Sequence, residues 1–179
     1  MNFYDLKETQ ATKAKFDSYI RKNSPNLVVI NAHGNELQLA GHNNDIIIDA
    51  NSRVPNAVLY ARSCDAGAAL GQKLVDNGAK AFIGYKRKFT LCFLGEYATR
   101  PLHDPIAKYF LESSNLIPTT VMKGNTVAEA HKRSKTQMLK DFRKMLSSEA
   151  TDDERWAARW VFANMSNQVL LGDPNARAV

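Results

Sequence analysis

The sequence predicts an α/β fold with a mostly parallel central sheet flanked by helices. Three mainly apolar runs, at residues 27–30, 57–61 and 79–85, have the composition of strands that are buried on both faces of a parallel sheet. Segments with the helical spacing of apolar residues lie between and after these runs. Strands that alternate with helices in this way are typical of α/β proteins.

The first half of the chain contains shorter elements around the first two apolar runs. Pro25 favours an extended entry into the run at residues 27–30. The expected elements are an amphipathic helix at residues 8–22, a strand at residues 45–49 and a helix through Leu70, Leu74 and Val75 that ends at Asn77-Gly78. Residues 2–6 are expected to form at most a short strand.

The second half of the chain is mainly helical and closes on a strand at residues 168–171. We expect a helix at about residues 105–112, and two further helices that open with capping boxes at Thr126-Val127-Ala128-Glu129 and Thr151-Asp152-Asp153-Glu154. The side chains expected to face inward are Val127, Ala130, Ser134, Met138, Phe142 and Met145 on the first of these two helices, and Trp156, Trp160 and Val161 on the second. Residues 86–104 lack periodicity, which predicts a functional loop.

The composition is that of one globular domain spanning residues 1–179. Hydrophobic residues make up 44% of the chain and charged residues 23%, and no apolar run approaches the roughly 20 residues needed to span a bilayer. The polar amino end does not read as a signal peptide, and two cysteines without metal-type spacing favour a reducing compartment. We therefore expect a cytoplasmic protein with no membrane partner.

The formal charge of +6 raises the question of a nucleic-acid partner. Basic residues are densest at residues 86–88 and 131–144. The second stretch lies on a predicted amphipathic helix, where a basic outer face is usually just solvated. A nucleic-acid-binding domain is thus the weakest of the functions considered.

Two residues that can carry out nucleophilic catalysis follow predicted strands. His33 comes after the run at residues 27–30, and Cys64 comes after the run at residues 57–61. The carboxyl ends of parallel strands lie at one edge of a sheet, so neighbouring strands would place the imidazole and the thiol side by side. The backbone N–H groups of Gly34 and Cys64 are candidate oxyanion donors. Gly67 would leave room where the chain turns into the next helix, whose dipole would favour the thiolate.

Each of these residues alone has a simpler explanation, because a free cysteine is usually a small buried side chain. The joint placement of His33 and Cys64 at strand ends, each with a nearby glycine, favours catalysis. Cys92 has no histidine nearby in the sequence and is expected to be a packed thiol. His42, His103 and His131 lack the spacing of metal ligands, so we expect neither a metal nor a cofactor.

The segment Asn31-Ala32-His33-Gly34 resembles the His-Gly motif of the caspase-like cysteine peptidases. Arg62-Ser63-Cys64-Asp65-Ala66-Gly67 resembles their nucleophile motif, in which a glycine also follows three residues after the cysteine. The resemblance is closest to the bacterial CHAT domains, relatives of separase and gingipain, and covers nearly the whole chain. Further similar segments are Ala11-Thr12, Asn77-Gly78-Ala79, Phe82-Ile83-Gly84-Tyr85 and Leu171-Gly172-Asp173-Pro174.

This resemblance implies a caspase-like three-layer sandwich. Such domains usually have one more strand and helix ahead of the segment that starts here, so we expect a smaller sheet, or a strand supplied by a partner chain or by a region outside this sequence. The resemblance also implies an endopeptidase that forms a thioester on Cys64, with His33 as acid and base. Bacterial relatives often act in defence or cell death, so we expect a protein or peptide substrate and an activating or regulatory partner.

The resemblance also assigns a substrate pocket to Arg62, Asp65, Lys86 and Arg87. In the resembling families, the position two before the nucleophile lines this pocket: it is an aspartate where substrates are basic and a glutamine in caspases. Arg62 occupies it here and would hold an acidic side chain bidentately, before the scissile bond. In the alternative, Arg62 pairs with Asp65 or Asp49 and selects nothing.

A different class of function also fits the sequence. A caspase-like module without turnover would use the loop at residues 86–104 to bind a partner protein. Reaction of Cys64 with a peptide-based electrophile separates this alternative from a peptidase.

Overall fold

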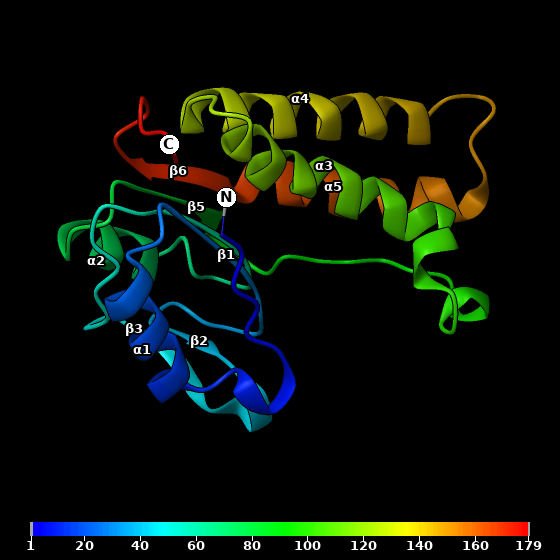
Figure 1. The fold of residues 1–179 in the computed structure, drawn as a ribbon. Coiled ribbons are helices and arrows are strands. Elements are labelled where there is room, and N and C mark those ends of the chain that lie inside the picture. Colours follow the sequence, from blue (N-terminus) through cyan, green and yellow to red (C-terminus); the bar gives the residue numbers. More distant parts are fainter. Residues whose placement is uncertain (1, 179) are drawn as a thin grey trace.

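The structure is a computed structural model that describes residues 2–178, and its centre is a four-stranded sheet (Figure 1). The strands are β1 (Leu27–Asn31), β4 (Val58–Arg62), β5 (Ala81–Tyr85) and β6 (Gln168–Gly172), in the order β1-β4-β5-β6. The pairs β1–β4 and β4–β5 are parallel, and β6 runs antiparallel to β5. The mostly parallel sheet predicted from the sequence is thereby confirmed.

Two further strands form a small antiparallel pair outside this sheet. They are β2 (Gln38–Ala40) and β3 (Ile46–Asp49), and the chain between them makes a short 3₁₀ turn at His42–Asn44. The prediction of a strand at residues 45–49 is confirmed within one residue. Its partner β2 was not predicted, because three residues are too few to show an alternating pattern.

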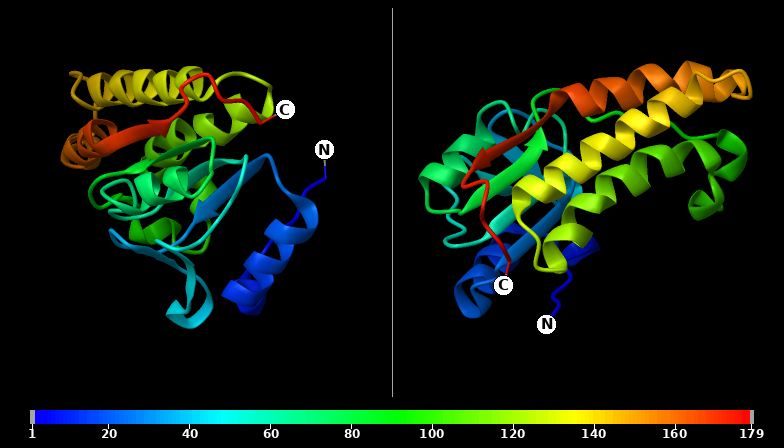
Figure 2. Two further views of the ribbon diagram at one scale, coloured as in Figure 1. Left: turned by 90° about the vertical axis from the view of Figure 1, so that its left-hand side faces the viewer. Right: turned by 90° about the horizontal axis from the view of Figure 1, so that it is seen from above.

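Helices cover both faces of the sheet, which is compatible with a three-layer sandwich (Figure 2). The helices are α1 (Lys13–Asn23), α2 (Leu70–Asp76), α3 (Pro105–Met122), α4 (Val127–Met145) and α5 (Asp152–Asn167). On one face, α1, α2 and the β2–β3 pair pack against the strands, and on the other α3 and α4 do so. Helix α5 packs on α3 and α4 and leads directly into β6.

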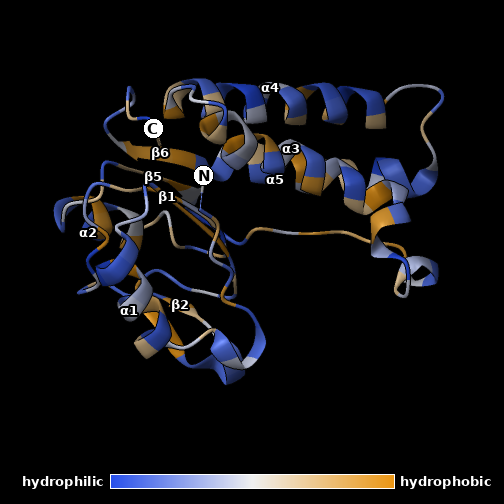
Figure 3. Cartoon of the chain, viewed as in Figure 1, coloured by the Kyte–Doolittle hydropathy of each residue, from blue (hydrophilic) through white to orange (hydrophobic). Residues whose placement is uncertain are grey.

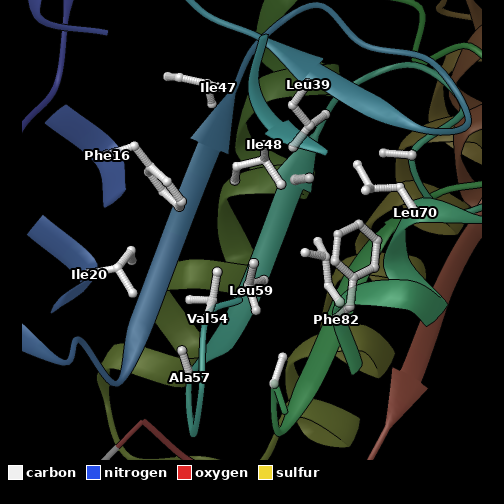
Figure 4. Close-up of a cluster of buried hydrophobic side chains, with 14 residues drawn as sticks. Phe16, Ile20, Leu39, Ile47, Ile48, Val54, Ala57, Leu59, Leu70 and Phe82 are labelled. Carbon is white, nitrogen blue, oxygen red and sulfur yellow. The ribbon is translucent and has the colours of Figure 1, made fainter. Parts of the chain in front are cut away.

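The two faces of the sheet carry separate apolar cores, since side chains of a strand alternate between faces. Leu59 of β4 and Phe82 of β5 belong to one core with Phe16 and Ile20 of α1, and Phe82 lies beside Leu70 of α2 (Figure 4). Tyr60, one residue after Leu59, belongs to the opposite core under α3 and α4. Colouring by hydropathy shows the same division, with apolar surfaces turned inward and a polar outer face on α4 (Figure 3).

Strand β1 differs from its prediction as a strand covered on both faces. It lies at the edge of the sheet, and Val29 is 43% exposed. An apolar run is compatible with either an edge or a central position, and here only β4 pairs with it within residues 2–178. Residues 2–6, for which at most a short strand was expected, form neither helix nor strand.

The first helix is shorter than predicted. Residues Glu8–Gln10 form a separate 3₁₀ turn, and α1 begins at Lys13. The break lies at Thr12, whose side chain caps the helix by accepting a hydrogen bond from Lys15 N at 3.4 Å.

Helix α3 is longer than predicted, running ten residues past the expected end at residue 112. It continues through Pro118, which has no N–H to donate to the Ser114 carbonyl. The buried side chains Ile117 and Val121 hold this last part of the helix against the sheet. Tertiary packing therefore outweighs the local preference against an interior proline.

Both predicted capping boxes are confirmed. Thr126 and Glu129 exchange hydrogen bonds at the start of α4, and Thr151 and Glu154 do so at the start of α5. Five of the six side chains expected to face inward on α4 are buried, and Phe142 is partly buried. None of the helices within residues 2–178 is both long and apolar enough to cross a membrane.

The prediction that both tryptophans of α5 belong to the core is wrong for Trp156. Its side chain is 57% exposed, while Trp160 is partly buried. The Arg159 guanidinium lies over both rings, 5.0 Å and 5.3 Å from their centroids. A cation over the ring contributes about 0.5–1 kcal/mol at an exposed site, so Trp156 adds little to the core.

Replacing Trp156 with alanine should therefore reduce the free energy of unfolding by about 1 kcal/mol or less. The matched change Phe110→Ala should cost about 3–5 kcal/mol, because Phe110 is 1% exposed. Urea denaturation followed by circular dichroism measures both. Equal losses for the two variants would contradict the exposed position of Trp156.

Candidate functional site

A cavity of about 390 Å³ lies where β1 and β4 end. Both strands point their carboxyl ends at it, as expected for the ligand site of a parallel sheet. It is lined by Asn31, Ala32, His33, Arg62, Ser63, Cys64 and Phe89. The two predicted catalytic residues and the predicted specificity arginine thus line one cavity.

His33 is placed by a turn that the β2 strand holds. Its carbonyl accepts a hydrogen bond from Ala40 N at 2.9 Å, and Asn35 N donates to the Gln38 carbonyl at 3.0 Å. The Asn35 side chain accepts from Leu37 N at 2.9 Å, which closes the turn. The His33 side chain itself is exposed and can reach a substrate.

Gly34 follows His33 at a point where the backbone touches the next strand end. A Cβ at this position would collide with the Ser63 hydroxyl and come within 2.7 Å of Leu39 Cδ2 and 2.9 Å of the Gln38 carbonyl oxygen. No residue larger than glycine fits here without a shift of its surroundings. The close contact therefore fixes the spacing between the histidine turn and the cysteine segment.

Cys64 is half-buried in the segment that follows β4. Its Sγ lies 3.9 Å from the Phe89 carbonyl oxygen, and within the described chain no hydrogen bond joins it to His33. The following residues are tied to the end of β5, because Asp65 N donates to the Arg87 carbonyl at 3.3 Å and Gly67 N donates to that of Tyr85 at 2.8 Å.

The helix after Cys64 is not placed to stabilise the thiolate by its dipole, as the sequence analysis expected. Helix α2 begins only at Leu70, and its first amide groups are already used. Leu70 N donates to the Glu36 carbonyl and Gly71 N to that of Ala66, both at 2.8 Å. Gly67 packs against Val169 and Tyr85 of the sheet rather than beneath the nucleophile.

The two predicted oxyanion donors remain available. Among residues 2–178, neither the Gly34 N–H nor the Cys64 N–H has a hydrogen-bond acceptor. Gly34 is part of an antiparallel bridge with Leu39, but the two hydrogen bonds there belong to its chain neighbours. Unpaired N–H groups beside a nucleophile are able to bind a developing negative charge.

Arg62 is held by neutral oxygen atoms and not by a carboxylate. Its Nε donates to Asn31 Oδ1 at 2.9 Å, and its Nη1 donates to Ser114 Oγ at 2.9 Å and to Asn115 Oδ1 at 3.2 Å. Neither Asp65 nor Asp49 forms an ion pair with Arg62 in the described structure, so the alternative in which one of them neutralises it is wrong. Asp49 instead pairs with Lys13, at 3.2 Å.

The three residues that hold Arg62 were missed by the sequence analysis. Asn31 lies directly opposite Arg62 in the β1–β4 register, so a correct strand alignment would have found it. Ser114 and Asn115 gave no signal, because the helix that carries them was expected to end at residue 112.

The buried polar side chains near Arg62 are Tyr60, Tyr85 and Gln168. Burial raises the pKa of Tyr60 and raises the pKa of Tyr85 well above its usual range, so both phenols keep their protons. The two hydroxyl oxygens lie 3.5 Å apart, and Gln168 Nε2 donates to Tyr85 Oη at 3.2 Å. These groups carry no charge that could neutralise the guanidinium.

The other predicted substrate-binding residues lie beside the cavity but do not line it. Asp65 is partly buried, and Lys86 and Arg87 are exposed. The loop at residues 86–104 contains only 3₁₀ turns, as predicted, and it contributes Phe89 to the cavity wall.

The loop is held against α5 at Thr90. Thr90 N donates to Asn164 Oδ1 at 3.0 Å, and Asn164 Nδ2 returns a hydrogen bond to the Thr90 carbonyl at 2.7 Å. Phe89, next in sequence, is therefore held at the cavity wall by this anchor.

The remaining cysteine and histidines lie apart from this cavity. Cys92 is buried in the core around α5, as predicted, and burial raises the pKa of its thiol. His131 approaches the Gln168 carbonyl at 3.4 Å, and burial lowers the pKa of its imidazole. Across residues 2–178 there is no group of three or more histidine, cysteine, aspartate or glutamate side chains that could hold a metal ion.

Comparisons with known proteins identify no relative of this chain. No family model matches the chain, and neither a curated protein nor a solved structure is similar to it at a significant level.

The close contact at Gly34 predicts that Gly34→Ala destabilises the fold by about 1–3 kcal/mol, the usual cost of overpacking. Gly95→Ala is the matched control, because no atom lies within 4 Å of the added methyl group. Ser63→Ala should be nearly neutral, since the buried Ser63 hydroxyl has no hydrogen-bond partner in the described part of the chain. Urea denaturation of the three variants checks the ranking, which fails if Gly95→Ala costs as much as Gly34→Ala.

Proposed function

We propose that this chain is a cysteine endopeptidase of the caspase-like type, with Cys64 as nucleophile and His33 as general acid and base. The observation that carries the proposal is the shared cavity at the ends of β1 and β4, which both side chains line. The pattern of a histidine-glycine turn after one strand and a cysteine after its neighbour is what the caspase-like resemblance implies. The assignment of the α/β fold to the caspase-like type is part of the same proposal.

The proposed chemistry uses the thiol of Cys64 and the imidazole of His33 at the scissile bond of a bound peptide. The Cys64 thiol passes its proton to His33, and the sulfur forms a bond to the carbonyl carbon of the scissile peptide. The C–N bond then breaks as the imidazolium returns that proton to the leaving amine. Neutral His33 next takes a proton from water, which attacks the thioester and releases the acid and the thiol.

No hydrogen bond joins the two side chains within residues 2–178, where the Cys64 thiol instead lies 3.9 Å from the Phe89 carbonyl oxygen. Catalytic contacts are often long before substrate binds and shorten in the complex. His33 lies on an exposed turn and can approach the leaving amine and the water.

The N–H groups of Gly34 and Cys64 are the proposed oxyanion donors. Both lack an acceptor within the described chain, and both belong to segments that are held by backbone hydrogen bonds. Donors that are fixed before the reaction need no reorganisation when the charge develops. Loss of one such donor costs about 3–4 kcal/mol of transition-state stabilisation in other enzymes.

The proposal predicts that a peptidyl chloromethyl ketone alkylates Cys64 and not Cys92. The raised pKa of the buried Cys92 thiol leaves less thiolate to react. His33→Ala should lower the turnover of a peptide pool by about 100-fold to 10,000-fold, the usual contribution of a general acid and base. Mass spectrometry locates the label, and a fluorogenic pool measures turnover.

Two controls make the result specific to the site. Cys92→Ala should keep both labelling and turnover, and Cys64→Ala should lose both. A protein whose Cys64 reacts no faster than a free thiol and which cleaves no peptide would instead be the interaction module without turnover.

A further inference from the structure

We propose that the cavity beside Cys64 is an anion site in which Arg62 binds an aspartate or glutamate side chain of the substrate through Nη2 alone, and that Ser114 is a positioning residue for this arginine. The inference rests on the proposed peptidase function, because it names the residue before the scissile bond. It assigns a role to Asn31, Ser114 and Asn115, which belong to β1 and α3 rather than to the cysteine segment.

The first step is the charge of the cavity. Arg62 lines it, and every acceptor of its guanidinium within residues 2–178 is a neutral oxygen. No carboxylate forms an ion pair with it in the described chain, and Asp49 forms its ion pair with Lys13. A guanidinium cannot lose its proton, so the cavity keeps a full positive charge.

The second step is the direction of the free donors. Nε is used by Asn31, and Nη1 is used by Ser114 and Asn115. Only Nη2 has no acceptor in the described structure. A carboxylate therefore binds Nη2 alone. The bidentate contact expected from the sequence would need Asn31 or Asn115 to be displaced.

The third step is the fixation of the arginine. Ser114 is fully buried, and its hydroxyl donates to the Leu111 carbonyl at 3.2 Å while it accepts from Arg62. Asn31 holds the other side of the guanidinium plane from β1. Side-chain freedom is thus lost before substrate binds, which favours affinity for a ligand of matching charge.

The experiment compares peptide pools that differ only in the residue before the cut. Wild-type protein should cleave the aspartate and glutamate pools with kcat/KM at least about tenfold above the asparagine and arginine pools, as expected for one charge-assisted hydrogen bond. Arg62→Met should remove the difference. Cleavage that depends on Cys64 but is equal for all pools overturns this inference and leaves the peptidase proposal intact.

The positioning role has a matched pair of variants on one helix. Ser114→Ala should raise KM for the acidic pools by about 2-fold to 10-fold and leave the neutral pools unchanged. Ser113→Ala is the control, because Ser113 is equally buried but its hydroxyl bonds only to Tyr109 and Phe110 of its own helix. Equal effects of the two variants on all pools overturn the positioning role.

A binding measurement keeps the inference testable if no pool is cleaved, a result that removes the peptidase proposal. Nitrogen-15 spectra of the Arg62 side chain in full-length Cys64→Ala protein should shift on addition of N-acetyl-aspartate N-methylamide. The asparagine analogue should shift them at least about tenfold less at equal concentration. Equal shifts, or none with either compound, overturn the anion site.

Discussion

The in-register parallel pairing of β1 with β4 is the interaction on which the rest of the site depends. Asn31 lies opposite Arg62, so the two chains leave the sheet at the same level, and His33 and Cys64 each follow two residues later. A slip of one residue would move Arg62 to the other face of the sheet and away from α3. One register therefore sets both the proposed dyad and the contacts of the arginine.

The loops beyond the strands are supported by neighbouring elements rather than by their own sequence. The β2 strand holds the turn of His33, and the end of β5 holds the segment after Cys64. Gly34 lies against Ser63, so the two loops touch where the strands diverge. Backbone hydrogen bonds carry this arrangement, and the Cys64 thiol adds a contact of 3.9 Å to the Phe89 carbonyl oxygen. Positioning by a rigid scaffold is the usual condition for reactive groups on loops.

Helix α3 contributes both to the apolar core under the sheet and to the hydrogen bonds that hold Arg62 at the cavity. Its last turns pack Ile117 and Val121 under the sheet, and the same packing brings Ser114 beside Arg62. The acceptors at the guanidinium are neutral, and burial keeps Tyr60 and Tyr85 protonated below it. A carboxylate in the same place would have balanced the charge and left a structural arginine. Neutral acceptors fix the geometry of the guanidinium without balancing its charge.

The amino-acid sequence by itself determined the central strands, the two capped helices and the position of a cysteine and a histidine after strands, because periodicity and capping act over a few residues. Only the tertiary structure decided that β1 is an edge strand, that Trp156 is exposed and that α3 passes through Pro118. It also decided the partners of Arg62, which lie 31 to 53 residues away along the chain. Such contacts depend on which elements pack together, and no local pattern records that choice.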